Sequence, residues 1–282
     1  MELCYKPDLK NKVAVVTGGA GVLCKEFAKA LALCGAKVAI LGRTLSKAEA
    51  VAEEIKEMGG EAIAVSVDVT DAQSVEKAHR EVLEKLGKCD ILINGAGGNN
   101  PRATTDKEYF EAGDIDSETK SFFDMSSEDV DFVFNLNFSG TLIPTQAFAR
   151  DMIGREGCTV LNVSSMNAYT PLTKIPAYSG AKAAISNFTQ WLAVHFSKVG
   201  IRVNAIAPGF FPTEQNKKLL WNEDGSPTAR TGKILAATPM ARFGTPEELL
   251  GALLFLVDEK AASFVTGIVI PVDGGFSAYS GV

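Results

Sequence analysis

A tyrosine and a lysine four positions apart have the types and spacing that most clearly suggest chemistry in this sequence. They are Tyr178 and Lys182, in the stretch Tyr-Ser-Gly-Ala-Lys. On a helix, residues at this spacing share a face, so the lysine ammonium would lie beside the phenol. A neighbouring positive charge favours the phenolate and lowers the pKa of a tyrosine from its ordinary value of about 10. The pair therefore predicts an acid/base group that works near neutral pH.

Two further polar positions support this interpretation. Ser164 and Ser165 follow an apolar, strand-like run, and Asn137 lies in a helical stretch, where a polar side chain is otherwise a poor choice. A Tyr-x-x-x-Lys pattern also occurs by chance, so the pair alone is weak evidence. A serine hydroxyl at the same sheet edge makes a catalytic group of side chains the stronger interpretation.

The glycine-rich stretch at residues 17–24, Thr-Gly-Gly-Ala-Gly-Val-Leu-Cys, predicts a phosphate-binding turn. It follows the apolar run at 13–16, and a helix is expected to begin near Val22. Backbone amides at a helix N-terminus, together with the helix dipole, suit a pyrophosphate. A plain glycine turn and a redox site at Cys24 are the alternatives. Only the helix dipole would favour a thiolate at Cys24, so packing is the better explanation for this residue.

The ends of the next three strand-like runs carry residues that suit the rest of a dinucleotide. Gly42-Arg43-Thr44 stands where a cofactor without a 2′-phosphate would meet an acidic residue. Arg43 would pair with a 2′-phosphate or stack on adenine, which favours NADP over NAD, or it is a solvated surface residue. Asp68 suits the adenine amino group, or it caps the following helix. The stretch 94–97 (Asn-Gly-Ala-Gly) would let backbone lie against a ribose, or it is only a tight turn.

These motifs can act together only in a fold that brings them to one place. The alternation of apolar runs with helical segments predicts such a fold. Strands are expected at 13–17, 37–41, 62–69, 90–94, 158–163, 201–206 and 267–272. Helices are expected at 22–34, 45–58, 71–86, 127–152, 177–198 and 246–257. Strands that are apolar throughout, each followed by a helix, imply a parallel sheet covered on both faces. The sequence predicts an α/β fold: a single Rossmann-type domain over 1–282, with a doubly wound seven-stranded parallel sheet and helices on both faces.

Two segments, 98–126 and 210–245, interrupt this alternation. Both are polar, contain Gly and Pro, and lack strand signals. Loops of this length in a compact domain are usually functional. Because each follows a strand, we expect both to overhang the ligand crevice; mobile surface insertions are the alternative.

Composition excludes several classes of protein. The net charge of −6 comes from 34 acidic and 28 basic residues with no basic cluster, which argues against a nucleic-acid partner. Residues 1–12 lack the apolar core of a signal peptide, and the longest apolar stretch, 249–257, is too short to span a membrane, so we expect a cytoplasmic protein. Five scattered cysteines and two histidines without partners at metal spacing predict neither disulfides nor a metal site.

Taken together, the motifs resemble the short-chain dehydrogenase/reductase family over essentially the whole chain. Ser165 precedes Tyr178 by 13 positions and Asn137 precedes it by 41, as in the family. The family's first loop reads T-G-x-x-x-G-x-G, whereas this chain has glycine at 21 instead of 22 and cysteine at 24.

The resemblance implies hydride transfer between a nicotinamide and a carbonyl or hydroxyl carbon. Tyr178 would exchange a proton with the substrate oxygen, Ser165 would hydrogen-bond that oxygen, Lys182 would bind the nicotinamide ribose, and Asn137 would hold a water of the proton relay. The implied cofactor-binding residues are Gly18, Gly19, Gly21, Val22, Leu23, Arg43, Thr44, Asp68, Val69, Asn94, Ala96, Gly97, Tyr178, Lys182, Pro208, Gly209 and Thr213. The family also implies a homo-oligomer, usually a tetramer, formed through the helices at 127–152 and 177–198.

Longer stretches narrow the resemblance to the D-mannonate oxidoreductase (fructuronate reductase) branch of the family. They include residues 163–182, the Ala-Pro-Gly-Phe-Phe-Pro-Thr-Glu-Gln-Asn run at 207–216 and the ending at 273–282. The branch implies a sugar-acid substrate from hexuronate catabolism; another polyol or keto-acid substrate, such as 5-ketogluconate, and a non-catalytic dinucleotide sensor are the alternatives. Donors suited to a polyhydroxylated anion are Asn99, Arg102, Lys174, Gln215, Asn216 and Arg230, beside Ser165.

Overall fold

A seven-stranded parallel sheet forms the centre of the chain in the computed structural model, which describes residues 1–212 and 220–281. The strands are β1 (Val13–Thr17), β2 (Lys37–Gly42), β3 (Glu61–Ser66), β4 (Ile91–Asn94), β5 (Cys158–Val163), β6 (Ile201–Pro208) and β7 (Val269–Val272). Their order is β3-β2-β1-β4-β5-β6-β7, and every neighbouring pair is parallel. The predicted doubly wound sheet is confirmed.

The first strand shows why the runs are apolar throughout. Val13 and Val15 belong to the core on one face of the sheet, and Ala14 and Val16 belong to the core on the other. Successive side chains of a strand point to opposite faces, so a strand covered on both sides needs apolar residues at every position.

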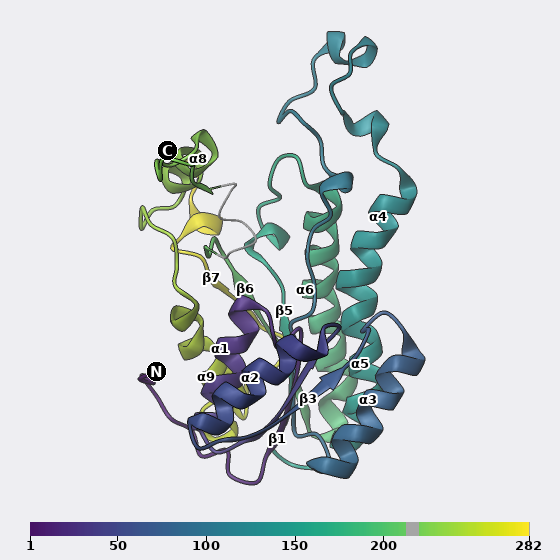
Figure 1. Cartoon of the computed structure of the whole chain (residues 1–282), viewed down its shortest axis with the longest axis vertical. Coiled ribbons are helices and arrows are strands. Elements are labelled where there is room, and N and C mark those ends of the chain that lie inside the picture. Colours follow the sequence, from purple (N-terminus) through teal and green to yellow (C-terminus); the bar gives the residue numbers. More distant parts are fainter. Residues whose placement is uncertain (213–219, 282) are drawn as a thin grey trace.

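Helices cover both faces of the sheet (Figure 1). They are α1 (Val22–Leu33), α2 (Leu45–Glu57), α3 (Ala72–Lys85), α4 (Ser127–Phe134), α5 (Gly140–Phe148), α6 (Pro176–Phe196), α8 (Ala229–Ala237), α9 (Leu250–Val257) and α10 (Glu259–Ala262). Phe27 of α1, Ile55 of α2 and Leu253 of α9 pack into one core, and Phe148 of α5 and Leu192 of α6 pack into the other.

The structure departs from the predicted helices in two places. The helix predicted at 127–152 is interrupted by a π-helical turn at Asn135–Ser139, between α4 and α5. Within the segment 210–245, expected to be a loop, residues Ala229–Ala237 form α8, whose N-cap Thr228 accepts a hydrogen bond from the Thr231 amide.

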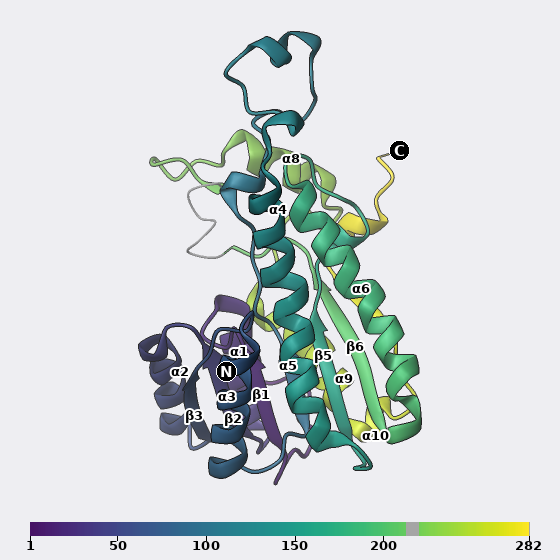
Figure 2. The same cartoon turned by 90° about the vertical axis from the view of Figure 1, so that its right-hand side faces the viewer.

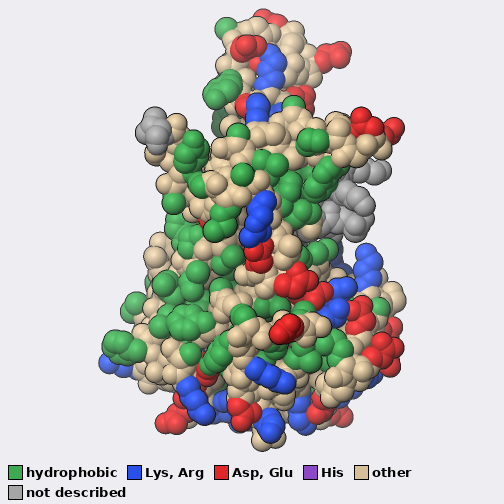
Figure 3. Space-filling model, turned by 90° about the vertical axis from the view of Figure 1, so that its left-hand side faces the viewer, with side chains coloured by type: hydrophobic (Ala, Val, Ile, Leu, Met, Phe, Trp, Pro, Cys, Tyr) green, Lys and Arg blue, Asp and Glu red, His purple; other side chains and the backbone are tan. Residues whose placement is uncertain are grey.

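The arm, residues 101–126, extends away from the body beyond the N-terminal end of α4 (Figures 1 and 2). It contains three short 3₁₀ turns, at Pro101–Ala103, Ala112–Asp116 and Phe122–Asp124. Its base contacts the loop after β5, where the Thr105 amide donates to the Lys174 carbonyl at 3.0 Å. The expected position over the crevice therefore applies to the base, whereas the tip projects past the body as the uppermost protrusion in Figure 3.

Candidate active site

The order of the strands reverses between β1 and β4, which lie side by side at the centre of the sheet. Open α/β sheets bind ligands at such a switch point, outside the carboxyl ends of the strands. A cavity of about 260 Å³ lies at this edge. Its lining residues are Leu23, Gly95, Gly97, Val163, Ser164, Ser165, Tyr178, Lys182, Pro208, Gly209, Phe210 and Phe211.

Tyr178 and Lys182 enter this cavity from the first two turns of α6, which begins at Pro176. Lys182 is buried, and its Nζ lies 5.6 Å from the centroid of the Tyr178 ring while donating to the Val163 carbonyl at 2.9 Å. Ser165, at the end of β5, hydrogen-bonds to the Tyr178 side chain. Ser164 points elsewhere, toward Ser186 at 2.7 Å. The structure thus brings the predicted Tyr, Lys and Ser together, with Ser165 as the serine that faces the tyrosine.

The pKa of Tyr178 differs from the expectation. Burial raises the pKa of its hydroxyl to about 12, against the lowering effect of the hydrogen bond with Ser165. Burial also lowers the pKa of Lys182 to about 8, against a smaller raising effect of Cys24. The predicted lowering of the tyrosine pKa by the lysine is therefore wrong, because desolvation disfavours both charged forms.

Asn137 lies in the π-helical turn and is fully buried. Its side-chain amide donates to the Gly98 and Val133 carbonyls, each at 2.8 Å, and its Oδ1 accepts from the Gly98 amide at 3.2 Å. These bonds use both amide hydrogens. In this arrangement the side chain of Asn137 positions the backbone at Gly98, next to Gly97, which lines the cavity. π-turns inside helices frequently occur at functional sites.

The glycine turn between β1 and α1 is shaped to receive a phosphate. Gly21 is the N-cap of α1; no side chain caps this helix, and its first turn contains no acidic residue. Gly18 has a φ of +63°, and a Cβ there would lie 2.9 Å from the Ala96 Cα. The turn therefore needs glycine at 18. It leaves the amides that begin α1, at Val22 and Leu23, without a competing carboxylate.

One cation and one anion of the predicted cofactor site, Arg43 and Asp68, follow the ends of β2 and β3. Arg43 and Thr44 are exposed after β2, and Thr44 is the N-cap of α2. Asp68 Oδ1 accepts from the Thr70 hydroxyl and amide, which lowers the pKa of Asp68 further than the nearby Arg43 charge does. The helix cap proposed as the alternative role of Asp68 is supplied instead by Asp71, the N-cap of α3. Val69, next to Asp68, is buried in the core.

In the stretch 94–97, the side chain of Asn94 and the backbone amides that follow it have different partners. The Asn94 side chain points into the protein, donating to Thr145 Oγ1 and Asn162 Oδ1 at 2.9 Å each. This side chain therefore joins β4 to β5 and α5, which leaves the backbone of Asn94 for the predicted contact with a ribose. The Thr17 hydroxyl accepts from the amides of Gly95 and Ala96 at 3.1 and 3.2 Å, which holds the turn against the end of β1.

The candidate substrate residues that the structure describes lie on different elements. Asn99 is exposed, and Arg102 forms an ion pair with Asp129 at 2.9 Å. Lys174 lies two residues before α6, and Arg230 lies in the first turn of α8. The predicted residues Thr213, Gln215 and Asn216 lie outside the described part of the chain.

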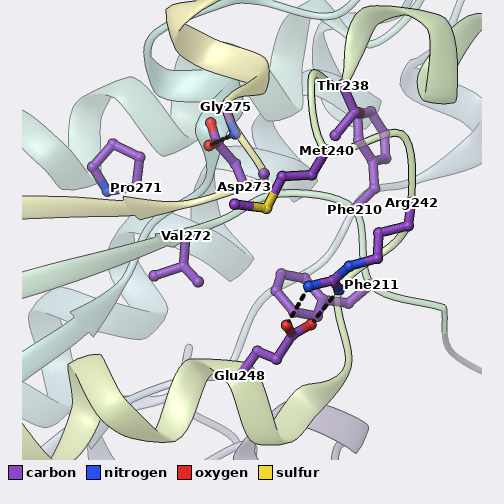
Figure 4. A pocket seen from close by; sticks show the side chains of 12 residues that line it. Phe210, Phe211, Thr238, Met240, Arg242, Glu248, Pro271, Val272, Asp273 and Gly275 are labelled. Carbon is purple, nitrogen blue, oxygen red and sulfur yellow. Dashed lines mark hydrogen bonds and ion pairs between the residues drawn. The ribbon is translucent and has the colours of Figure 1, made fainter.

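The sequence motifs did not single out the aromatic wall of the site, Phe210 and Phe211, although both follow Pro208-Gly209 directly. The same two rings also line a second cavity, of about 380 Å³, on the side of β7 (Figure 4). Its charged groups are already satisfied: Arg242 binds Glu248 through two bonds of 2.8 and 2.6 Å, and Asp273 accepts from the Gly275 and Ser277 amides. The candidate chemistry therefore lies in the smaller cavity.

The described residues contain no group of three or more His, Cys, Asp or Glu side chains that could hold a metal ion. All five cysteines are free, and burial raises the pKa of the Cys24 thiol to about 12. Cys24 is therefore a neutral packing residue at neutral pH. No described helix is long and apolar enough to cross a membrane.

Residues 12–224 match the short chain dehydrogenase family. Together with the sheet order and the Tyr178, Lys182 and Ser165 cavity, this match places the chain in that family of NAD(P)-dependent oxidoreductases acting on CH–OH groups.

The sequence similarity to known proteins covers nearly the whole chain. A crystal structure from Haemophilus influenzae, provisionally described as a D-mannonate oxidoreductase and containing bound NAD, is 57% identical, with a TM-score of 0.94 and 98% of each chain covered. The uncharacterized oxidoreductase UxuB of Bacillus subtilis is 55% identical over 276 residues, which cover 98% of each protein. The 5-keto-D-gluconate 5-reductase of Escherichia coli is 30% identical over 95% of this chain and 96% of its own length.

Proposed function

We propose that the protein reduces a keto sugar acid to a hydroxy acid, with D-fructuronate as substrate and D-mannonate as product, in hexuronate catabolism. The observation that carries the reaction type is the cavity in which the Tyr178 hydroxyl, Ser165 and the Lys182 ammonium converge. The sugar-acid substrate is supported by the 57% identity to the Haemophilus protein. It is also supported by the cations Lys174, two residues before α6, and Arg230, in the first turn of α8.

The crevice fits a nicotinamide dinucleotide. A pyrophosphate can be placed at the uncapped N-terminus of α1, where Gly18 and Gly19 keep the backbone accessible, and a Cβ at Gly19 would meet the Val16 carbonyl at 2.8 Å. Gly97 would lie at the ribose, beside the buried Lys182 Nζ and Asn137. When bound, the nicotinamide supplies the hydride in the reductive direction.

The chain's own residues supply the proton and the orientation. Tyr178, a neutral phenol at neutral pH, donates its proton to the carbonyl oxygen of the substrate. Ser165 holds that oxygen by a hydrogen bond, so the carbonyl carbon is presented toward the floor of the cavity. Lys182, anchored on the Val163 carbonyl, places a positive charge beneath the tyrosine ring, where it favours the phenolate that forms when the proton leaves.

Arg43 determines our proposal for the cofactor. Its exposed guanidinium lies beside Asp68 at the end of β2, where an arginine can bind a 2′-phosphate. The Haemophilus structure contains NAD. We propose that this pocket accepts both cofactors and that Arg43 supplies the additional affinity for NADP(H).

A second candidate substrate is 5-keto-D-gluconate. It is supported by the similarity to the Escherichia coli reductase of that compound at 30% identity. Both candidates are keto sugar acids with the carbonyl at the same position relative to the carboxylate, and they differ in the configuration of the hydroxyl-bearing carbons.

The test is a rate measurement with D-fructuronate, 5-keto-D-gluconate and related keto acids, each with NADH and NADPH. The proposal expects kcat/KM to be greatest for D-fructuronate. A preference for 5-keto-D-gluconate would select the second candidate, and the absence of turnover with every keto acid would contradict both.

A homo-tetramer is the proposed assembly. The outward faces of α4 and α6, which lie side by side in Figure 2, expose Phe132, Trp191 and Val194 at 46%, 56% and 77%. Exposed apolar patches of this kind mark contact surfaces. Light scattering measures the mass of the particle in solution, which is then compared with the mass of one chain, 29.9 kDa.

A further inference from the structure

The arm meets α8 through an ion pair, and it also contacts the loop that leads into α6. The Glu108 carboxylate of the arm accepts a hydrogen bond of 2.7 Å from Lys233 of α8. Three residues before Glu108, the Thr105 amide holds the Lys174 carbonyl. Lys174 precedes Tyr178 by four residues, so these contacts join both insertions to the segment that leads into the catalytic helix.

Glu108 binds one cation directly and lies within the electrostatic reach of two more. The hydrogen bond from Lys233 holds the pKa of Glu108 below its ordinary value, and the charges of Lys233, Lys174 and Arg230 lower this pKa further. The group of Lys174, Arg230 and Lys233 is called the cation cluster below. One carboxylate does not balance three cations, so the cluster carries a surplus of positive charge.

The two other cations of the cluster have no ion pair among the described residues. Lys233 is bound by Glu108, whereas Lys174 and Arg230 form no salt bridge in that part of the chain. Arg102, the other candidate cation of the arm, differs in this respect because it is bound to Asp129 at 2.9 Å. Among the described residues, Lys174 and Arg230 can therefore bind an incoming carboxylate, whereas Lys233 is already bound to Glu108.

The backbone of Lys174 is held in an uncommon conformation. Its φ of +72° lies in the left-handed region, which residues other than glycine adopt rarely. The hydrogen bond from Thr105 fixes its carbonyl in this conformation, so the arm determines where the Lys174 side chain leaves the chain. Such backbone conformations are often found at ligand-binding positions.

We propose that the cation cluster is the subsite for the substrate carboxylate and that Glu108 is its internal counter-ion. In the absence of substrate, Glu108 keeps the cations together; when an anionic substrate arrives, Glu108 competes with it for them. This inference rests on the proposed sugar-acid substrate and adds the residues that select for its charge.

The variant that isolates this role is Glu108→Gln, which keeps the shape of the side chain and removes its charge. Loss of the competing carboxylate lowers KM for the keto sugar acid by about three- to tenfold, the usual size of one partly exposed charge interaction. The values of kcat and of KM for the cofactor stay unchanged. Arg230→Met and Lys174→Met raise KM for the acid by about tenfold or more, because a cation is lost.

Glu111→Gln is the matched control. Glu111 is also a carboxylate of the arm bound to a lysine, at 2.6 Å from Lys107, but its partner does not belong to the cation cluster. Its substitution leaves KM for the acid unchanged. An unchanged or raised KM in Glu108→Gln, or an equal fall in Glu111→Gln, would overturn the proposal.

A binding measurement separates this inference from the proposed reaction. Calorimetry of D-mannonate with the complex of the protein and NAD gives a dissociation constant that falls in Glu108→Gln, whether or not the acid is turned over. Tighter binding without turnover in the parent protein supports the subsite and contradicts the proposed reaction. Turnover in the parent without tighter binding in Glu108→Gln supports the reaction and contradicts the subsite.

Discussion

The side chain of Cys24 packs directly against Gly95, and this contact leads to a specific prediction about the altered glycine loop. A Cβ built on Gly95 would lie 2.1 Å from the Cys24 sulfur, more than 1 Å inside ordinary van der Waals contact. Cys24 is 5% exposed, so its sulfur has no open space to move into. The cysteine that replaces the last glycine of the loop is thus accommodated by a glycine in the turn after β4.

The substitution Gly95→Ala should therefore be costly. Overpacking of a well-filled core destabilises a protein by about 1–3 kcal/mol, and this overlap lies at the upper end of that range. Because Gly95 lines the same cavity as Tyr178 and its amide is held by Thr17, the displaced turn should also weaken cofactor binding. Cys24→Ala alone should cost about 1 kcal/mol, through loss of a small buried group.

The double variant tests the coupling between these two positions. Removing the sulfur leaves the Cys24 Cβ at 3.5 Å from an added methyl group, which is an ordinary contact, whereas the Thr17 carbonyl remains at 2.9 Å. Cys24→Ala with Gly95→Ala should accordingly recover about 1–2 kcal/mol relative to the sum of the single variants, without reaching the parent stability.

The assay is urea unfolding at one protein concentration, combined with cofactor titration by fluorescence. Gly232→Ala is the control, because a Cβ on this helical glycine meets nothing within 4 Å and should raise stability by about 0.5–1 kcal/mol. If Gly95→Ala is as stable as the parent, or if the double variant equals the sum of the singles, the steric account of the loop is refuted.

Three further predictions concern the chemistry. Tyr178→Phe should reduce kcat by about 10²–10⁴-fold and leave cofactor affinity intact; near-parent turnover would contradict the assignment of the proton donor. A plot of kcat/KM for reduction against pH should be level below about pH 8 and fall above it, as the Lys182 ammonium with its pKa of about 8 loses its proton, and a rise above pH 8 would contradict a role for this charge. Arg43→Ala should raise KM for NADPH by about ten- to a hundredfold, the worth of a charge-assisted hydrogen bond, with KM for NADH unchanged; an equal effect on both would contradict its contact with the 2′-phosphate.

The sheet and the position of the site could be predicted from the sequence for one physical reason. A strand buried on both faces must be apolar at every position, as at Val13–Thr17, and such runs are easily distinguished from the helices between them. Once the strands are parallel, their carboxyl ends share one edge. Motifs that follow different strands, such as the turns at 94–97 and 164–165, must then lie near one another.

Features that depend on tertiary contacts could not be predicted in this way. The π turn at Asn135–Ser139 changes the helix by a local insertion that leaves no mark in hydrophobic periodicity. The side chain of Asn94 turns inward because Thr145 and Asn162 offer it partners, and neither is near it in sequence. The path of the arm is determined by contacts such as those of Lys107 with Glu111 and Asp114, which polar composition alone does not reveal.

The pair of Tyr178 and Lys182 shows how burial can reverse an inference from spacing. Spacing correctly placed Tyr178 and Lys182 on one face of α6, but it predicted a tyrosine that readily loses its proton. In the folded chain Lys182 donates to the Val163 carbonyl, and desolvation leaves Tyr178 with a pKa of about 12. A tyrosine that keeps its proton at neutral pH is suited to donating it, which is the role required when a carbonyl is reduced. The same burial makes the oxidative direction, which needs the phenolate, the one that should gain most from high pH.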